Sequence, residues 1–149
     1  MSDDEVRDFL AEQKIVGCAT ISPNGRPHLV SLWYVPDGDD LRGWTYAKSQ
    51  KAKNLERDPR ATLQVDDGVQ YHELRGVMLE CDVDMERDPV RVADYGRALF
   101  RRYGGAGDDG ELVPEVERMI EKQATKRVGL RFKPTRTVSW DHGKLGGAY

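Results

Sequence analysis

The chain has 149 residues, of which 38% are hydrophobic and 33% are charged, and its formal net charge is −3. This length suits a single domain over 1–149, and the interspersed charge argues against a nucleic-acid partner, which normally requires a basic surplus. No apolar run is long enough to span a membrane, and the acidic start MSDDEVRDFL is unlike a signal peptide. We therefore expect a cytoplasmic protein with no membrane partner.

The chain contains two cysteines, Cys18 and Cys81, each within an apolar run typical of a strand. We expect both to be buried and reduced. The three histidines lie far apart without ligand spacing, so we expect no metal site. No P-loop, G-x-S-x-G or G-x-G-x-x-G motif occurs, which leaves a bound cofactor as the expected source of any reactive group.

The first fifty residues predict one helix and three strands. Ser2 and Glu5 form a capping box ahead of apolar residues at helical spacing, which predicts a short helix ending near Gln13. Asn24 and Gly25 lie between two apolar runs and are typical of a hairpin turn. The strand-like runs span 15–21, 28–35 and 41–47. We expect these three strands to form an antiparallel meander.

The remainder mixes helices and strands without regular alternation. A helix from Ser49 must end by Asp58, because Pro59 disfavours helical geometry at the residue before it. Two more helices are expected, one from Asp88 to Gly104 and one from Pro114, with a glycine-rich loop at 104–110 between them. Strands are expected at 60–65, 74–84, 125–133 and 135–140, the last two separated by Pro134. This pattern predicts an α+β, mainly β domain, either a barrel or a sandwich, with helices on its rim.

The stretch at 44–55, WTYAKSQKAKNL, is typical of a strand end, a short connection and the start of a helix. Ser49 is a good N-cap, and Lys51 and Lys53 lie in the first helical turn, which the helix dipole already makes positive. A serine cap, unpaired amides and two lysines suit a bound phosphate or carboxylate. The alternative is a solvated helix start with incidental lysines, and the local pattern favours neither.

Four motifs in this order resemble those of the flavin- and deazaflavin-binding split β-barrel proteins related to pyridoxamine 5′-phosphate oxidase. They are T-x-S-P-N-G-R-P-H at 20–28, VSLWYV at 30–35, WTYAKSQKAKNLERDPRATL at 44–63 and VSWDHGKLGG at 138–147. The resemblance covers nearly the whole chain and implies an antiparallel split β-barrel of about six to seven strands. It also implies a homodimer with the cofactor in a groove at the interface.

The resemblance implies phosphate contacts from the strand-to-helix connection, here Thr45, Ser49, Gln50 and Lys51, with Lys53 nearby. The full set of implied cofactor-binding residues is Val30, Ser31, Trp33, Thr45, Tyr46, Ala47, Ser49, Gln50, Lys51, Lys53, Asn54 and Trp140. The first three line one wall of the slot for the flavin-like ring. The last comes from the partner chain, or else anchors its own terminal strand.

In the FMN-dependent members of that family an arginine usually stands where this chain has Gln50, so the resemblance favours the deazaflavin coenzyme F420, with FMN as the alternative. We expect an oxidoreductase that passes a hydride from reduced F420 to an unsaturated small-molecule acceptor. The proton then comes from solvent, Tyr46 or His72, and no catalytic residue is identified. The alternatives are an FMN-binding oxidase or flavin reductase, a non-catalytic carrier of deazaflavin or a tetrapyrrole-sized ligand, and a barrel without a working cofactor site.

Overall fold

The computed structural model describes residues 1–104 and 110–147. Its strands are β1 (Val16–Ile21), β2 (Pro27–Leu32), β3 (Val35–Asp37), β4 (Asp40–Tyr46), β5 (Arg60–Asp67), β6 (Arg75–Glu86) and β7 (Arg127–Asp141). Its helices are α1 (Asp3–Glu12), α2 (Gln50–Arg57), α3 (Pro89–Tyr103) and α4 (Pro114–Ala124), with short 3-10 helices η1 (Tyr71–Glu73) and η2 (His142–Leu145). Most of the predicted glycine-rich loop, 105–109, lies outside the described residues.

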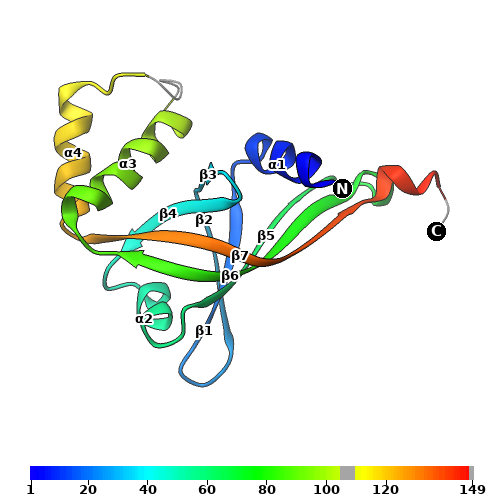
Figure 1. Cartoon of the computed structure of the whole chain (residues 1–149), viewed down its shortest axis with the longest axis horizontal. Coiled ribbons are helices and arrows are strands. Elements are labelled where there is room, and N and C mark those ends of the chain that lie inside the picture. The colour runs from blue at the N-terminus through cyan, green and yellow to red at the C-terminus, as the bar shows by residue number, and fades with distance from the viewer. Residues whose placement is uncertain (105–109, 148–149) are drawn as a thin grey trace.

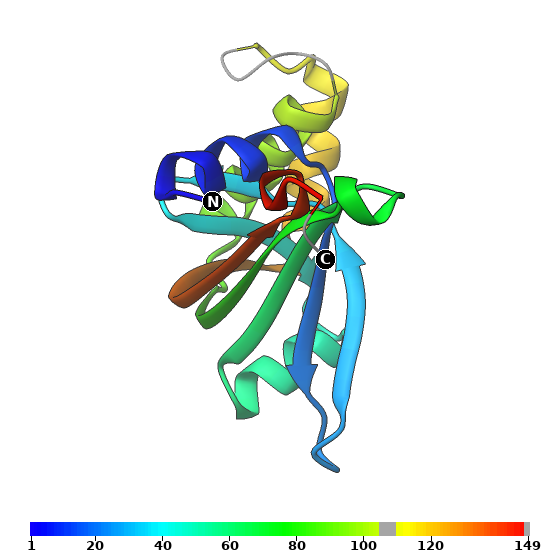
Figure 2. The ribbon, with the colours of Figure 1, turned by 90° about the vertical axis from the view of Figure 1, so that its right-hand side faces the viewer.

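The strands form one antiparallel sheet in the order β2-β1-β5-β6-β7-β4-β3. β2 and β3 lie at opposite edges of this sheet, although only residues 33 and 34 separate them in sequence. The sheet therefore curls until its two edges approach each other (Figures 1 and 2). Where they approach, a Cβ added to Gly43 of β4 would lie 3.2 Å from the carbonyl oxygen of Trp33. The predicted α+β fold of the split β-barrel type is confirmed.

The single strand predicted over 28–35 is wrong, because the chain leaves the sheet at Tyr34. This side chain is fully buried, and its hydroxyl donates to the carbonyl oxygen of Leu10 at 2.7 Å. The backbone N–H of Tyr34 donates to the hydroxyl of Tyr103 at 3.0 Å instead of to a neighbouring strand. β2 therefore ends there and β3 begins at the other edge. The expected meander is wrong for the same reason, since β4 pairs with β3 and β7 and not with β2.

One continuous strand, β7, replaces the two strands that were predicted on either side of Pro134. On the neighbouring β6, Glu80 pairs with Arg136 whereas Cys81 pairs with Pro134, so Thr135 is the extra residue of a β-bulge. A bulge tolerates proline, which has no N–H to give to the ladder. The Thr135 hydroxyl donates to the Glu80 carbonyl oxygen at 3.1 Å and holds the bulge in place.

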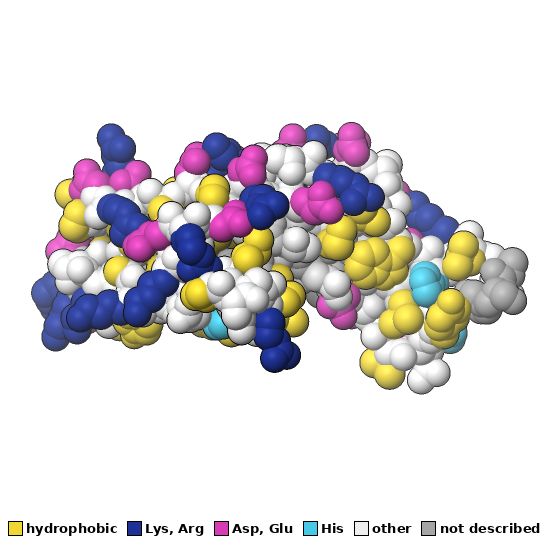
Figure 3. Space-filling view, turned by 90° about the horizontal axis from the view of Figure 1, so that it is seen from below, with side chains coloured by type: hydrophobic (Ala, Val, Ile, Leu, Met, Phe, Trp, Pro, Cys, Tyr) yellow, Lys and Arg dark blue, Asp and Glu magenta, His cyan; other side chains and the backbone are white. Residues whose placement is uncertain are grey.

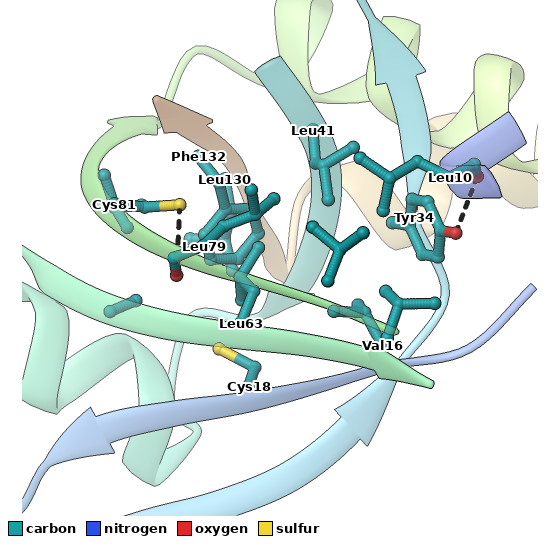
Figure 4. Packing of buried hydrophobic residues seen from close by; sticks show 14 of the residues in the cluster. Leu10, Val16, Cys18, Tyr34, Leu41, Leu63, Leu79, Cys81, Leu130 and Phe132 are labelled. Carbon is teal, nitrogen blue, oxygen red and sulfur yellow. Dashed lines mark hydrogen bonds between the residues drawn. The ribbon is translucent and has the colours of Figure 1, made fainter. Parts of the chain in front are cut away.

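The barrel interior holds the main hydrophobic core (Figure 4). Its largest fully buried side chains include Tyr34, Leu41, Leu63, Leu130 and Phe132. The alternation predicted for β6 is confirmed, because every second residue points into this core. These residues are Val77, Leu79, Cys81 and Val83, none more than 5% exposed.

Cys18 and Cys81 are buried and form no disulfide, as predicted. Burial disfavours the charged thiolate. It raises the pKa of Cys18 to about 11 and that of Cys81 to about 12. Both thiols are therefore protonated at neutral pH and act as small apolar core residues.

α3 and α4 lie side by side on the outer face of β4 and β7 (Figure 1). Glycine makes the close packing possible at two places. A Cβ on Gly96 of α3 would lie 2.5 Å from the ring of Trp44, and a Cβ on Gly129 of β7 would lie 2.9 Å from the ring of Tyr95. Trp44 of β4 therefore fills the space beside a glycine of α3, and Tyr95 of α3 fills the space beside a glycine of β7.

α1 and α2 begin and end where the sequence predicts. Ser2 and Glu5 form the capping box of α1, and Ser49 caps α2, which ends before Asp58. No helix in the described part of the chain is both long and apolar enough to cross a membrane.

Candidate functional site

Two groups of side chains lie on the two sides of the end of β4. Successive strand residues point to opposite faces, so Thr45 faces inward and is buried, whereas Tyr46 faces outward and is 50% exposed. The inner group, which we call the α2 polar cluster, consists of Thr20, Thr45, Ser49, Lys51 and Asn54. The outer group, which we call the aromatic pocket, includes Trp33, Trp44, Tyr46, Phe100, Met119 and Arg127.

The start of α2 is fixed by its cap and by the connection before it. Ala47 donates its N–H to the Lys126 carbonyl oxygen at 2.9 Å, which holds the connection against β7. The Ser49 hydroxyl accepts from the N–H of Ala52 at 3.1 Å and lies 3.2 Å from the hydroxyl of Thr45. The first turn of α2 contains no acidic residue. The positive end of the helix dipole is therefore not balanced by a carboxylate of the helix itself.

Lys51 is the cation of the α2 polar cluster, and its side chain is unusually buried for a lysine. Its side chain belongs to a residue that is only 7% exposed, and it forms no ion pair with any described carboxylate. Burial lowers the pKa of Lys51, and the neighbouring Cys18 partly opposes that shift. Burial of a lysine side chain without a counter-charge costs hydration of its ammonium group. Such an arrangement is expected where an anionic ligand completes the site.

Asn54 is the member of the α2 polar cluster that links α2 to β1. It is fully buried, and its amide donates to the Thr20 hydroxyl at 3.1 Å while its Oδ1 accepts from Gln50 at 2.8 Å. His28 stands directly opposite Thr20 in the β1–β2 ladder. Nδ1 of His28 is buried and has no hydrogen-bond partner among the described residues. Two polar groups on this side, from His28 and Lys51, are thus left without partners.

The structure separates the two β2 residues that the resemblance placed beside the ring. Val30 pairs with Cys18 and points to the side of the α2 polar cluster. Ser31 pairs with Gly17 and points to the outer surface, where it is exposed. Within one chain, only Val30 therefore points to the side of the α2 polar cluster.

The other basic residues near α2 differ in whether their charge is free to bind an anion. Lys53 is exposed. Arg57 donates to the backbone carbonyl of Ile21, and Arg60 pairs with Asp58 at 2.8 Å. Figure 3 views the face that carries α2 and shows more basic side chains toward the end with α3 and α4 than toward the opposite end.

The aromatic pocket is a cavity of about 390 Å³ beside α3 and α4. Trp33 stacks on Tyr103 with ring centroids 4.3 Å apart and planes 7° from parallel. The guanidinium of Arg127 lies 3.9 Å from the ring centroid of Tyr46 and 4.7 Å from that of Trp44. Trp33 and Tyr46, two of the predicted cofactor contacts, thus lie together in this pocket and not in the α2 polar cluster.

Trp140 and His72 lie far from both groups within one chain. Trp140 is near the last residue of β7, whereas the first residue of that strand, Arg127, pairs with Tyr46 (Figure 1). Its ring packs over Gly76, where a Cβ would come within 2.2 Å. His72 lies in η1, which contacts η2 after the same end of β7. Either residue can reach the α2 region only from a partner chain.

Among the residues in or beside these groups that sequence reasoning missed are Thr20, His28 and Arg127. Thr20 and His28 open and close the hairpin motif, and their direct pairing follows from the Asn-Gly turn, so that signal was present. Arg127 gave no such signal, because its place beside Tyr46 depends on the pairing of β4 with a strand far along the chain. The described residues contain no group of three or more His, Cys, Asp or Glu side chains that could hold a metal.

The family model for pyridoxamine 5′-phosphate oxidase matches residues 2–141. The chain belongs to this family. A solved relative, the conserved hypothetical protein Rv2991 from Mycobacterium tuberculosis, is 38% identical; the match covers 100% of this chain and 90% of that one, with a TM-score of 0.87. No curated protein matches the sequence at a significant level.

Two more distant structures share the fold of this family member. A protein described as an F420 reductase is 24% identical over 89% of this chain and 94% of its own, with a TM-score of 0.66. HutZ, described as the heme storage protein of Vibrio cholerae, is 18% identical over 91% of this chain and 92% of its own, with a TM-score of 0.69. The same barrel is therefore found in proteins with different ligands.

Proposed function

We propose that this family member is an F420-dependent oxidoreductase that passes a hydride from reduced F420 to an unsaturated organic acceptor. The observation that carries the proposal is Lys51 at the start of α2, a largely buried lysine that forms no ion pair with a described carboxylate. A protein keeps such a group when a bound anion repays the lost hydration, as a cofactor phosphate does.

The donors of the α2 polar cluster fit a phosphate group. The Thr45 and Ser49 hydroxyls lie 3.2 Å apart at the N-terminus of α2, where the first helical amides lack partners within the helix, and Lys51 supplies the charge. The unpaired Nδ1 of His28 offers one more polar contact on this side. F420, when bound, would supply the hydride, while these side chains bind its phosphate and hold it in place.

Gln50 is the residue that favours F420 over FMN in this proposal. Its side-chain amide is neutral and donates to Asn54, so it gives the site hydrogen bonding without a second positive charge. The F420 reductase that shares the fold is consistent with this choice. FMN is the alternative cofactor.

A homodimer is part of the proposal, because two large apolar side chains are exposed on the outer face of β1 and β2 and at the start of β1. Ile15 is 50% exposed and Leu29 is 70% exposed, and both line one open hollow of about 580 Å³. A Cβ on Gly17 would lie 3.8 Å from Leu29, so this side chain lies flat on the strand surface. A second copy on this face would cover it and bring a further aromatic residue, Trp140, toward the cofactor.

Separate titrations of the purified protein with F420 and with FMN, followed by tryptophan fluorescence, test the choice of cofactor. We expect saturable binding of F420. Saturable micromolar binding of FMN without any response to F420 would overturn the cofactor assignment. Oxidation of reduced F420 by a panel of enones and quinones then tests turnover, since a carrier would bind the cofactor without reoxidising it.

A further inference from the structure

The aromatic pocket has the features of a second ligand site on the side of β4 opposite the α2 polar cluster. Thr45 and Tyr46 point to opposite faces of this strand, so the sheet itself separates the two groups. The cavity of about 390 Å³ lies in the range that small-molecule sites usually occupy, roughly 300–1,000 Å³.

One wall of the pocket is held rigidly although it faces solvent. Trp33 is 50% exposed, yet its ring is stacked on Tyr103 at 4.3 Å. The Tyr103 hydroxyl lies 2.7 Å from the carbonyl oxygen of Lys14 and 2.8 Å from that of Tyr34, and it shares its single proton between these acceptors, which fixes the Tyr103 ring of the stack. An exposed aromatic surface that is already ordered binds a flat partner with little further loss of side-chain entropy.

The opposite wall is formed where the helices stop covering the sheet. α3 packs on Trp44 through Gly96, but Tyr46, two residues further along the same face of β4, is left half exposed. Met119 of α4 overhangs this region and is 41% exposed. Aromatic and thioether groups therefore surround an opening that the fold does not fill.

Arg127 is the only cation among the described residues that line this pocket, and its charge is not neutralised by a described carboxylate. Its Nε donates to Gln123 at 3.3 Å, and its guanidinium lies over Tyr46. By contrast, Arg131 further along β7 pairs with both Asp37 and Asp40, at 2.9 and 2.7 Å. A guanidinium whose terminal nitrogens are unpaired beside aromatic rings matches a planar carboxylate bidentately.

We propose that the aromatic pocket binds a planar, apolar molecule that carries one carboxylate. The rings of Trp33, Trp44 and Tyr46 contact the apolar body, and Arg127 binds the carboxylate. Binding at this site does not require the cofactor, because the α2 polar cluster lies on the other side of β4.

Equilibrium dialysis with naphthalene-2-carboxylate and its neutral analogue naphthalene-2-carboxamide tests the proposal. We expect the carboxylate to bind at least about tenfold more tightly than the amide, because only the carboxylate accepts charge-assisted bonds from Arg127. Arg127→Gln removes this preference, and Arg127→Lys restores part of it, since lysine keeps the charge but not the planar fork. Arg118→Gln, at an exposed position on α4, is the matched control and leaves binding unchanged.

Three results would overturn the proposal: equal binding of acid and amide, unchanged preference in Arg127→Gln, or competitive displacement of the acid by F420. Circular dichroism and F420 titration of the Arg127→Gln variant establish that it is folded. The test also separates this site from the proposed function. If the protein binds the naphthoate but not F420, the proposed pocket stands and the cofactor assignment is wrong. If it binds F420 but not the naphthoate, the cofactor assignment stands and the proposed pocket is wrong.

Discussion

The two sides of the end of β4 present a cation in opposite ways. On the inner side Lys51 is buried and unpaired, and burial lowers its pKa. On the outer side Arg127 is half buried and lies over two aromatic rings, where a weakly hydrated guanidinium is stable without a counter-ion. The inner side therefore needs its ligand to compensate for lost hydration, whereas on the outer side the aromatic rings already stabilise the cation before any ligand binds.

The largest effect is expected from Gly96→Val, which disturbs the outer side alone. A Cβ at this position would lie 2.5 Å from the Trp44 ring and 3.0 Å from Ile120, so the α3–α4 pair must move off β4. We expect the free energy of unfolding to fall by about 3 kcal/mol, the upper end of overpacking effects. Urea denaturation measures the change, with the exposed Arg91→Val on the same helix as control. Tight F420 binding should survive, and its loss would show that the two sides are coupled.

Lys51→Met disturbs the inner side alone and should separate binding from stability. Methionine keeps the apolar stem but removes the buried charge, so we expect F420 affinity to fall at least about tenfold. The free energy of unfolding without ligand should rise, because an unpaired buried charge has been removed. Lys53→Met, at an exposed position in the same turn, is the control and should change both quantities little. A destabilised Lys51→Met variant with normal F420 affinity would contradict the comparison.

The lowered pKa of Lys51 also gives the inner side a pH dependence. Between the folded pKa and the higher unfolded pKa, the unfolded chain binds more protons, so the free energy of unfolding rises with pH in that window. F420 affinity should fall over the same window, as the ammonium is lost. Urea denaturation and F420 titration at increasing alkaline pH measure both trends, and Lys51→Met should remove this contribution from each.

Tyr103→Phe is expected to have a smaller effect, limited to the rigid wall of the aromatic pocket. It removes the hydroxyl that contacts the carbonyl oxygens of Lys14 and Tyr34 and the N–H of Tyr34. We expect a loss of about 1 kcal/mol in unfolding free energy and weaker naphthoate binding, with F420 affinity unchanged. Tyr95→Phe is the matched control, because the Tyr95 ring packs over Gly129 and its hydroxyl makes no hydrogen bond within the described chain. Equal losses in the two variants would refute the role of the hydroxyl.

The smallest effect on stability is expected at an exposed cation, which serves as a reference for the buried Lys51 and for Arg127 in the aromatic pocket. Lys144 pairs with Glu5 at 2.6 Å, and together with the Ser2 backbone N–H it lowers the pKa of Glu5 from 4.5 to about 2. Lys144→Met should raise this pKa toward 4.5 in an NMR titration. Because the folded pKa is the lower one, the stability from this pair is present above pH 4.5 and is lost as pH falls toward 2. An unchanged pKa of Glu5 would mean that the pair does not form in solution.

The local elements could be predicted because their signals are local. The capping box at Ser2, the Ser49 cap, the Asp88-Pro89 start and the inward alternation of β6 each depend on residues within a few positions of one another. The part of the candidate site at the start of α2 could be predicted from the sequence for the same reason. β5 nevertheless extends to Asp67, two residues beyond the predicted strand end.

The errors arose where a distant contact overrides the local pattern. The run 28–35 is strand-like throughout, but Tyr34 is drawn inward by the α1 backbone and by Tyr103. Pro134 looks like a strand breaker until the bulge opposite Glu80 is known. The burial of Lys51 and the position of Arg127 beside Tyr46 likewise depend on packing and on strand pairing that a one-dimensional pattern does not contain.

The two-residue link between β2 and β3 has a consequence for solubility. An open sheet exposes unpaired N–H and C=O groups at each edge, and such edges recruit strands of other molecules into aggregates. Here the first edge strand begins with Pro27, and the last is three residues long with Pro36 at its centre. The curled sheet also turns these two edges toward each other. The barrel can thus remain split without presenting a long regular edge for polymerisation.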